Sequence, residues 1–205
     1  MPRQNRVQPD GQILAHRTRG AVMGNRGVLH DDNAHHHGKL THRRWRHKAW
    51  VCCVLSFKNR QRRLMAPNRY TELFFYDEAV ALAAGHRPCA ECRRRDHKAF
   101  LTAADHSGSA PAFDDKLHTA RAIPRIYGQN RQLTDTRTLP DATFILTDTG
   151  PTLLLEDMAL PFNPDGYAAP IKRPEGLFPV LTPAPTRIAL HNGFRPTLRL
   201  SATLA

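Results

Sequence analysis

The sequence lacks a long apolar run. No stretch approaches the roughly 20 consecutive apolar residues that a membrane-spanning helix needs, and the first ten residues, MPRQNRVQPD, lack the apolar segment of a secretory signal. We therefore expect a cytoplasmic protein with no membrane partner. The chain has 205 residues, of which 40% are hydrophobic, so it is long enough to bury a core.

Cysteine is also scarce, with four residues that fall into two close pairs. In a reducing compartment, so few cysteines are more typical of metal ligands than of a disulfide framework. The neighbours Cys52 and Cys53 cannot bridge each other without strain. Cys89 and Cys92 form a Cys-x-x-Cys pair, whose spacing lets both thiolates face one ion while backbone N–H groups bond to the sulfurs. The sequence therefore predicts a zinc site that includes this pair.

Acidic residues are missing from a long window. Between Asp32 and Glu72 there is no Asp or Glu, while ten Lys and Arg residues occur there. Residues 101–205 hold ten basic and ten acidic side chains, so the net charge of +12 belongs to the first 100 residues. Such a field attracts polyanions, of which nucleic acid is the commonest, although a solvated basic face is the alternative. The basic residues that we expect to contact phosphates, of DNA in the first place, are Arg43, Arg44, Arg46, Lys48, Arg60, Arg62, Arg63, Arg93, Arg94 and Arg95.

The pattern of apolar and turn residues predicts an α+β fold. After an irregular Gly- and His-rich segment at 1–38, with one strand near 12–15, residues 39–104 are expected to form a basic zinc-binding domain. The strands of this domain are expected to pair antiparallel and to lie within 45–57, 62–66 and 70–76.

Two helices complete this domain. The first follows an N-cap at Asp77, has Glu78 in its first turn and stops at Gly85, and the second covers 93–104. In the second helix, basic residues in the first turn oppose the helix dipole unless a phosphate lies there.

The second half of the chain is electrically neutral. Residues 105–112 read as a polar linker, and 113–205 as a small α+β region of unassigned role. It is expected to contain a helix at 113–122, a β-hairpin of strands 143–147 and 152–156, and an extended Pro-rich stretch at 161–185.

Two further segments carry candidate chemistry. Residues 19–27 place three glycines around Arg19 and Arg26, which is typical of tight turns or, more weakly, of a backbone that approaches a phosphate. The histidines at 35–37 are metal-competent but are more typical of an exposed loop, whereas His30 follows an apolar pair and is the better ligand candidate.

The stretch FYDEAVALAAGHRPCAECR, residues 75–93, closely resembles the zinc-binding module of Ada-type metal-binding domains. In that family, a sheet with an earlier cysteine pair precedes a helix that ends in Ala-Gly-Phe/Tyr-Arg-Pro-Cys-x-x-Cys. The resemblance covers about residues 43–100. It implies a four-cysteine zinc site on a DNA-binding surface, and a thiolate that accepts a methyl group from a DNA phosphotriester.

The first cysteine pair departs from the family pattern. The family has Cys-x-x-x-Cys, whereas here Ser56 stands four residues after Cys52 and the second thiol is Cys53. Because successive strand residues point to opposite faces, regular geometry presents only one of the two to an ion. The site is therefore either four thiolates, presented through a bulge, or three thiolates completed by His30, His47 or another residue. The first is favoured, because the chain has only these four cysteines.

Three functions follow from these features. The first is a nucleic-acid-binding protein with a structural zinc, associated with DNA repair or a nuclease. The second is an enzyme, which either transfers an alkyl group from a phosphotriester to a zinc-bound cysteine or cleaves nucleic acid with a metal. In the third, the neutral half binds a protein or small ligand and the basic half docks it.

Overall fold

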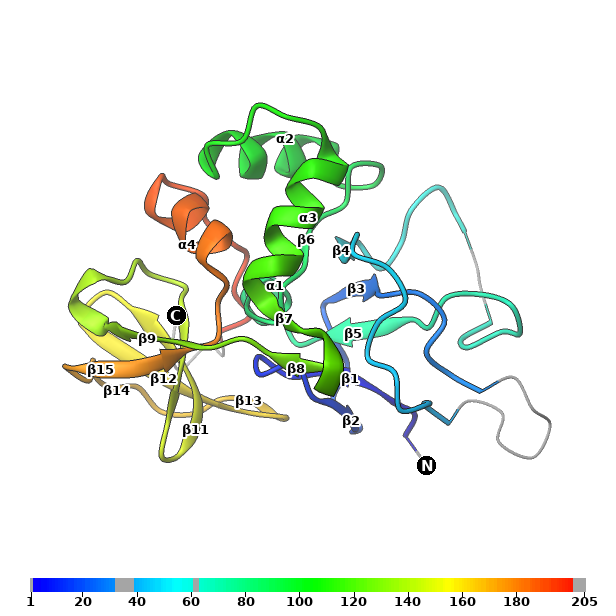
Figure 1. Ribbon diagram of the computed structural model, residues 1–205. Helices are drawn as coiled ribbons and strands as arrows, with labels where there is room; N and C mark the ends of the chain where they lie inside the picture. The colour runs from blue at the N-terminus through cyan, green and yellow to red at the C-terminus, as the bar shows by residue number, and fades with distance from the viewer. Residues whose placement is uncertain (1, 32–38, 61–62, 201–205) are drawn as a thin grey trace.

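The computed structural model describes residues 2–31, 39–60 and 63–200 and confirms an α+β fold (Figure 1). Its helices are α1 (Glu78–Ala83), α2 (Arg94–Ala103), α3 (Ala110–Arg121) and α4 (Ala184–His191), with short 3-10 turns η1 (Pro124–Ile126) and η2 (Thr136–Thr138). The first sheet is formed by β1 (Gln4–Val7), β2 (Ile13–Ala15), β3 (Val22–Asn25), β4 (Val51–Cys53), β5 (Leu73–Phe75) and β6 (Arg87–Pro88).

This first sheet is mixed rather than antiparallel. Its strand order is β2-β1-β5-β3-β4-β6, and the β1–β5 and β4–β6 pairs are parallel. Residues 1–38 supply three of its strands. The strand expected near 12–15 is confirmed as β2, whereas β1 and β3 lie in what was expected to be irregular chain. The reason is that these strands have only three or four residues and include polar stretches such as Gln-Asn-Arg-Val, which carry little periodic signal.

The other expected strands are shorter than their apolar patterns suggest. Of 45–57, only Val51–Cys53 is a strand, and the described part of 62–66 has none. Lys58, Asn59 and Met65 have positive φ angles of 51°, 54° and 54°, which no strand tolerates. The described residues 54–60 and 63–72 are therefore turns and irregular chain rather than strands.

Helix α1 forms as expected and lies at the centre of the molecule. The Asp77 carboxylate accepts a hydrogen bond from the N–H of Val80 at 3.0 Å, and all six residues of α1 are buried. Gly85 ends the helix with φ 86°, a left-handed conformation that an L side chain rarely adopts. The same glycine turns the chain into β6.

A second sheet lies at the other end of the molecule (Figure 1). The expected hairpin is confirmed as β10 (Phe144–Thr147) and β11 (Gly150–Leu155). The sheet also contains β9 (Gln132–Asp135), β12 (Met158–Asn163), β13 (Gly166–Tyr167), β14 (Ile171–Lys172) and β15 (Leu177–Val180).

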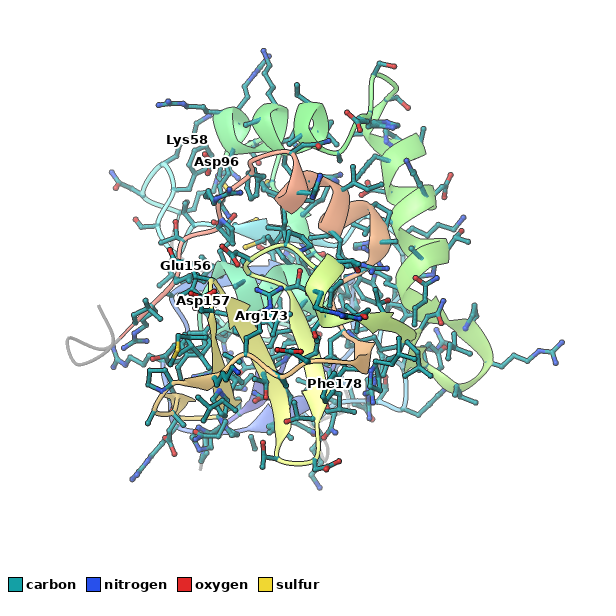
Figure 2. The ribbon with its side chains drawn as sticks, turned by 90° about the vertical axis from the view of Figure 1, so that its left-hand side faces the viewer. Lys58, Asp96, Glu156, Asp157, Arg173 and Phe178 are labelled. Carbon is teal, nitrogen blue, oxygen red and sulfur yellow. The ribbon has the colours of Figure 1, made fainter. Side chains whose placement is uncertain are left out.

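Arg173 holds one side of this sheet together. It follows β14, and Figure 2 labels it together with Glu156. Its guanidinium donates to the carbonyl oxygens of Thr136, Leu139 and Glu156 at 2.6–3.0 Å, and lies 3.4 Å from a carboxylate oxygen of Asp141.

The two sheets share one core. Its buried cluster runs from Val7 in β1 through α1 to Phe144 in β10 and Phe194 after α4. The Gln129 amide, in the small ribbon of β7 (Ala122–Ile123) and β8 (Gly128–Gln129), donates to the carbonyl oxygens of Pro9, Ala83 and Leu181 at 3.0–3.1 Å. The amide thereby ties the N-terminal sheet, α1 and the chain after β15 to one another.

The stretch expected as a linker, 105–112, is mostly exposed but is not irregular throughout. Helix α3 begins within it, at Ala110, and the Ser109 hydroxyl caps its N-terminus. No helix within the described ranges is both long and apolar enough to cross a membrane.

Helix α3 is attached to β6 by a buried ion pair. The Asp114 carboxylate accepts two hydrogen bonds of 2.7 Å from Arg87, and both side chains are at most 6% exposed. We expect Asp114→Ala to lower the free energy of unfolding by about 3–5 kcal/mol, because Arg87 would remain buried without its carboxylate. Urea denaturation monitored by circular dichroism measures this loss.

The neighbouring residue provides the control. Asp115 pairs with Lys48 at 2.7 Å, but both side chains are about 60% exposed. Asp115→Ala should therefore change the unfolding free energy by less than about 1 kcal/mol. Equal losses in the two variants would contradict the role assigned to the buried pair.

Candidate metal centre

Two parallel strands bring the cysteines together. In the β4–β6 pair, Cys52 lies opposite Pro88, and the N–H of Cys89 donates to the carbonyl oxygen of Cys52 at 2.9 Å. Cys53 ends β4 and Cys89 follows β6, so both lie at the C-terminal ends of these two parallel strands. The turn between β6 and α2 then brings Cys92 back to these strand ends.

The sulfurs of Cys53, Cys89 and Cys92 form a cluster in which all lie within 4.8 Å of one another. Around a tetrahedral zinc with Zn–S bonds of about 2.3 Å, sulfurs stand about 3.8 Å apart, so a small contraction would suit an ion. The N–H of Glu91 points to the Cys89 sulfur at 3.4 Å, as expected for a Cys-x-x-Cys turn. The structure therefore supports a metal-binding cluster of three cysteines.

Cys52 stands apart from this cluster. Its side chain is fully buried on the other face of β4, and its sulfur accepts a hydrogen bond from Arg93 at 3.6 Å. No bulge interrupts the β3–β4 or β4–β6 register, so the strand keeps its alternation and presents Cys53 alone. The favoured expectation of four thiolates is thus replaced by a set of three.

The histidines considered as substitute ligands lie outside the cluster. His30 is buried, and its Nδ1 is 2.7 Å from the Thr71 hydroxyl. His47 is exposed, and its Nε2 is 3.1 Å from the Asn25 side-chain oxygen. The run at 35–37 falls outside the described residues. Among the residues described, no fourth Cys, His, Asp or Glu joins the three sulfurs.

Without an ion, the cluster favours one thiolate. A hydrogen bond with Cys53 is the main cause that lowers the pKa of Cys89 to about 5, and the backbone N–H groups of Cys92 and Glu91 act in the same direction. The same contact with Cys89 raises the pKa of Cys53, and burial raises the pKa of Cys92. Burial also raises the pKa of Cys52. A divalent cation would favour the thiolate form of all three clustered sulfurs.

All three sulfurs line a cavity of about 680 Å³. Its wall includes apolar side chains from β4 and β5, among them Val51 and Phe74, and the buried carboxylate of Glu72. Arg6, Arg19 and Arg60 also line it. Glu91 lines it as well and pairs with Arg60. A ligand in this cavity would therefore meet sulfur, apolar surface and a small excess of positive charge.

The basic residues expected to contact phosphates fall into several environments. Arg46, Lys48, Arg60, Arg63, Arg94 and Arg95 are exposed, and Arg43 and Arg44 are half-buried. Of the exposed ones, Lys48 pairs with Asp115, and Arg60 donates two hydrogen bonds to Glu91. Arg62 lies outside the described residues.

Arg93 is not available for a phosphate. Its side chain is 8% exposed and pairs with Glu78 at 2.6 Å and with Asp96, labelled in Figure 2, at 2.8 Å. Its expected role is therefore corrected: it neutralises the buried carboxylate of Glu78, pairs with the partly exposed Asp96 and contacts Cys52. The pattern of three consecutive arginines does not reveal this, because the first precedes α2 and faces inward.

Arg6 and Arg19 were missed as candidates for the metal cavity. The only sequence signal was the glycine-rich stretch 19–27, whose second arginine, Arg26, lines a different cavity. Gly24 in this stretch allows β3 and β4 to approach, because a Cβ there would lie 2.2 Å from the Val51 carbonyl oxygen.

Comparison with known proteins gave no match: no family model, no curated protein and no solved structure is similar to this chain.

The environments of the cysteines predict an order of reactivity in protein stripped of metal by a chelator. At pH 7, Cys89 should react first with iodoacetamide, because its lowered pKa makes it a thiolate. Cys52 should react last, because it is buried and its pKa is raised. Peptide mass spectrometry at short reaction times measures the order, and equal labelling of Cys52 and Cys89 in folded protein would contradict it.

Proposed function

We propose that the protein is a zinc-binding protein that holds its ion through Cys53, Cys89 and Cys92 and binds nucleic acid beside it. The observation that carries the proposal is the cluster of three sulfurs in the wall of a large cavity. Zinc follows from the donors, since thiolates in a Cys-x-x-Cys turn are typical zinc ligands, whereas an iron–sulfur cluster usually takes four cysteines.

Three protein ligands leave one position of a tetrahedral ion for water or a ligand, which is the arrangement of catalytic rather than structural zinc sites. Three thiolates and one Zn²⁺ carry a net charge of −1, which keeps the sulfurs electron-rich. Alkyl transfer to a cysteine would use such a sulfur, but it rests on the resemblance to Ada-type domains and stays a prediction.

Nucleic acid is the proposed partner because of the charge around the cavity. Arg6, Arg19 and Arg60 line it beside the two carboxylates Glu72 and Glu91. Arg94 and Arg95 are exposed in the first turn of α2, two and three residues after Cys92. A phosphate at this turn would face both the arginines and the free N–H groups of the helix. DNA is favoured over RNA by the resemblance alone.

The metal site is tested by zinc content. We expect purified wild-type protein to hold one zinc, and Cys53→Ser, Cys89→Ser and Cys92→Ser to lose it or bind it much more weakly, because each removes a thiolate. Cys52→Ser is the matched control, since it changes the adjacent cysteine outside the cluster, and should retain the metal. Atomic absorption on dialysed samples measures the ratio. Zinc loss in Cys52→Ser with retention in Cys53→Ser would reverse the assignment.

The nucleic-acid proposal predicts a salt-dependent affinity. Fluorescence anisotropy with a labelled duplex should show log K falling linearly with log salt, and the Arg94→Ala/Arg95→Ala double variant should reduce the slope by about 1–2, because each phosphate contact contributes about 0.9. Arg125→Ala/Lys172→Ala removes two exposed charges from the second half and should leave the slope unchanged. Affinity that does not vary between about 50 and 300 mM salt would refute the proposal, and an RNA duplex in parallel decides between the nucleic acids.

A further inference from the structure

A second, smaller cavity of about 220 Å³ lies away from the sulfurs. It is bounded by the turn between β1 and β2, the loop before β4, the end of α3 and β8. Four of its lining residues are arginines, namely Arg26, Arg44, Arg121 and Arg131, and the only carboxylate among the lining residues is Asp10. Both tryptophans of the chain, Trp45 and Trp50, line it as well.

Two of the arginines are buried against one tryptophan. The guanidinium carbons of Arg26 and Arg121 lie 4.1 and 3.8 Å from the centre of the Trp50 ring, and each residue is 2% exposed. Gly85 makes room for this arrangement, because a Cβ there would lie 2.4 Å from the Arg121 Cδ. The glycine that ends α1 thus also admits a buried arginine.

The hydrogen-bond partners of these buried arginines are neutral. Arg26 donates to the Ala84 carbonyl oxygen and to His86, each at 3.3 Å, and burial lowers the pKa of His86, which keeps it uncharged. Arg121 donates to the carbonyl oxygens of Gly85 and Lys48. Its Nε is buried without a hydrogen-bond partner among the residues described.

The nearby carboxylates are already engaged. Asp114 accepts two hydrogen bonds from the Arg87 guanidinium. Asp10 accepts hydrogen bonds from the backbone and the side chain of Gln12. Four arginines and one carboxylate leave the cavity with three positive charges. Burial and the charge of Arg44 lower the pKa of Arg26 to about 9. The positive charge of Arg26 is therefore unfavourable where it lies. Buried arginines without a counter-ion are rare in proteins, and an anion would offset this charge.

We propose that this cavity binds the phosphate group of a small phosphate ester through its four arginines. Guanidinium groups match the oxygens of a phosphate with paired hydrogen bonds, and a dianion suits an excess of three positive charges. The volume is below the 300–1,000 Å³ typical of drug-sized ligands, so the cavity suits a phosphate and the nearest part of its ester. Arg26 and Arg121 are buried, so the local dielectric is low and the attraction is stronger than in water.

The alternative is that the arginines have only a structural role, as hydrogen-bond donors to backbone carbonyl oxygens. Arg131 separates the two readings, because it is exposed and lines the cavity without lying in the core. If the arginines are purely structural, Arg131 has no role in binding. If the cavity binds a phosphate, the charge of Arg131 contributes to the affinity.

Native tryptophan fluorescence provides the readout, since both tryptophans line the cavity. The zinc-loaded 205-residue protein is titrated with inorganic phosphate and with ribose 5-phosphate at constant ionic strength. Isothermal calorimetry repeats both titrations. We expect saturable binding with a Kd of about 0.01–1 mM. Zinc is measured in the same samples, so an effect here is distinguished from a loss at the metal centre.

Arg131→Ala and Arg44→Ala should each weaken binding at least about 5-fold. Arg125→Ala is the matched control, because Arg125 is an exposed arginine on the same segment that does not line the cavity, and it should bind as wild type does. The proposal is overturned if neither method detects saturable binding up to about 10 mM, or if Arg125→Ala weakens binding as much as Arg131→Ala.

A phosphate ester can be free or can be the end of a nucleic-acid strand. A 5′-phosphorylated oligonucleotide and its 5′-hydroxyl counterpart, each used to compete with ribose 5-phosphate, distinguish the sources. Stronger competition by the phosphorylated strand identifies the strand end, and equal competition by the two strands identifies the free ester.

Discussion

Helix α1 lies between the two sheets with all six residues buried, including Glu78, and it is the constraint on which the other elements depend. A helix so enclosed must have its polar ends satisfied inside the protein. The Asp77 carboxylate accepts hydrogen bonds from the N–H groups of Val80 and Arg199 and from the Tyr167 hydroxyl. The cap of α1 therefore also anchors β13 and the C-terminal segment.

The same helix supports the metal centre. Burial raises the pKa of Glu78, whereas its pair with Arg93 at 2.6 Å opposes that rise. Arg93 follows Cys92 directly and also contacts the sulfur of Cys52. One buried ion pair thus fixes the turn that carries Cys92 relative to α1, and β4 relative to both. The ligands are positioned by the core as well as by their own spacing.

The sequence predicted those parts of the fold that depend on one residue or on a few adjacent residues. Asp77 as a cap, Gly85 as a helix stop and the hairpin of β10 and β11 each follow from a few adjacent residues, and the structure confirms them. The N-terminal strands were not predictable in this way. Strands of three or four residues are stabilised by their neighbours in the sheet, and β1 pairs with β5 across more than 60 residues of sequence.

In the candidate site, too, local sequence predicted some features, whereas pairing with distant strands decided the others. Strand alternation correctly indicated that only one of Cys52 and Cys53 faces the cluster, whereas four thiolates would require a bulge that β4 does not have. Which cysteine faces the cluster depends on the parallel register of β4 with β6, a pairing that no local pattern specifies. The cavity beside the sulfurs is lined in part by Arg6 and Arg19, which β1 and the segment before β3 bring there.

Net charge is a poor guide to what each arginine does in this chain. Arg87 and Arg93 are buried with carboxylates, so they add to the formal charge but little to the field outside. Arg94 and Arg95 are exposed and contribute to the field that a polyanion meets. Arg26 and Arg121 are buried with neutral partners, an arrangement that costs folding free energy unless a ligand compensates it. The role of each arginine therefore follows from its partners rather than from its position in the sequence. An anion beside Trp50 would compensate the buried charges of Arg26 and Arg121.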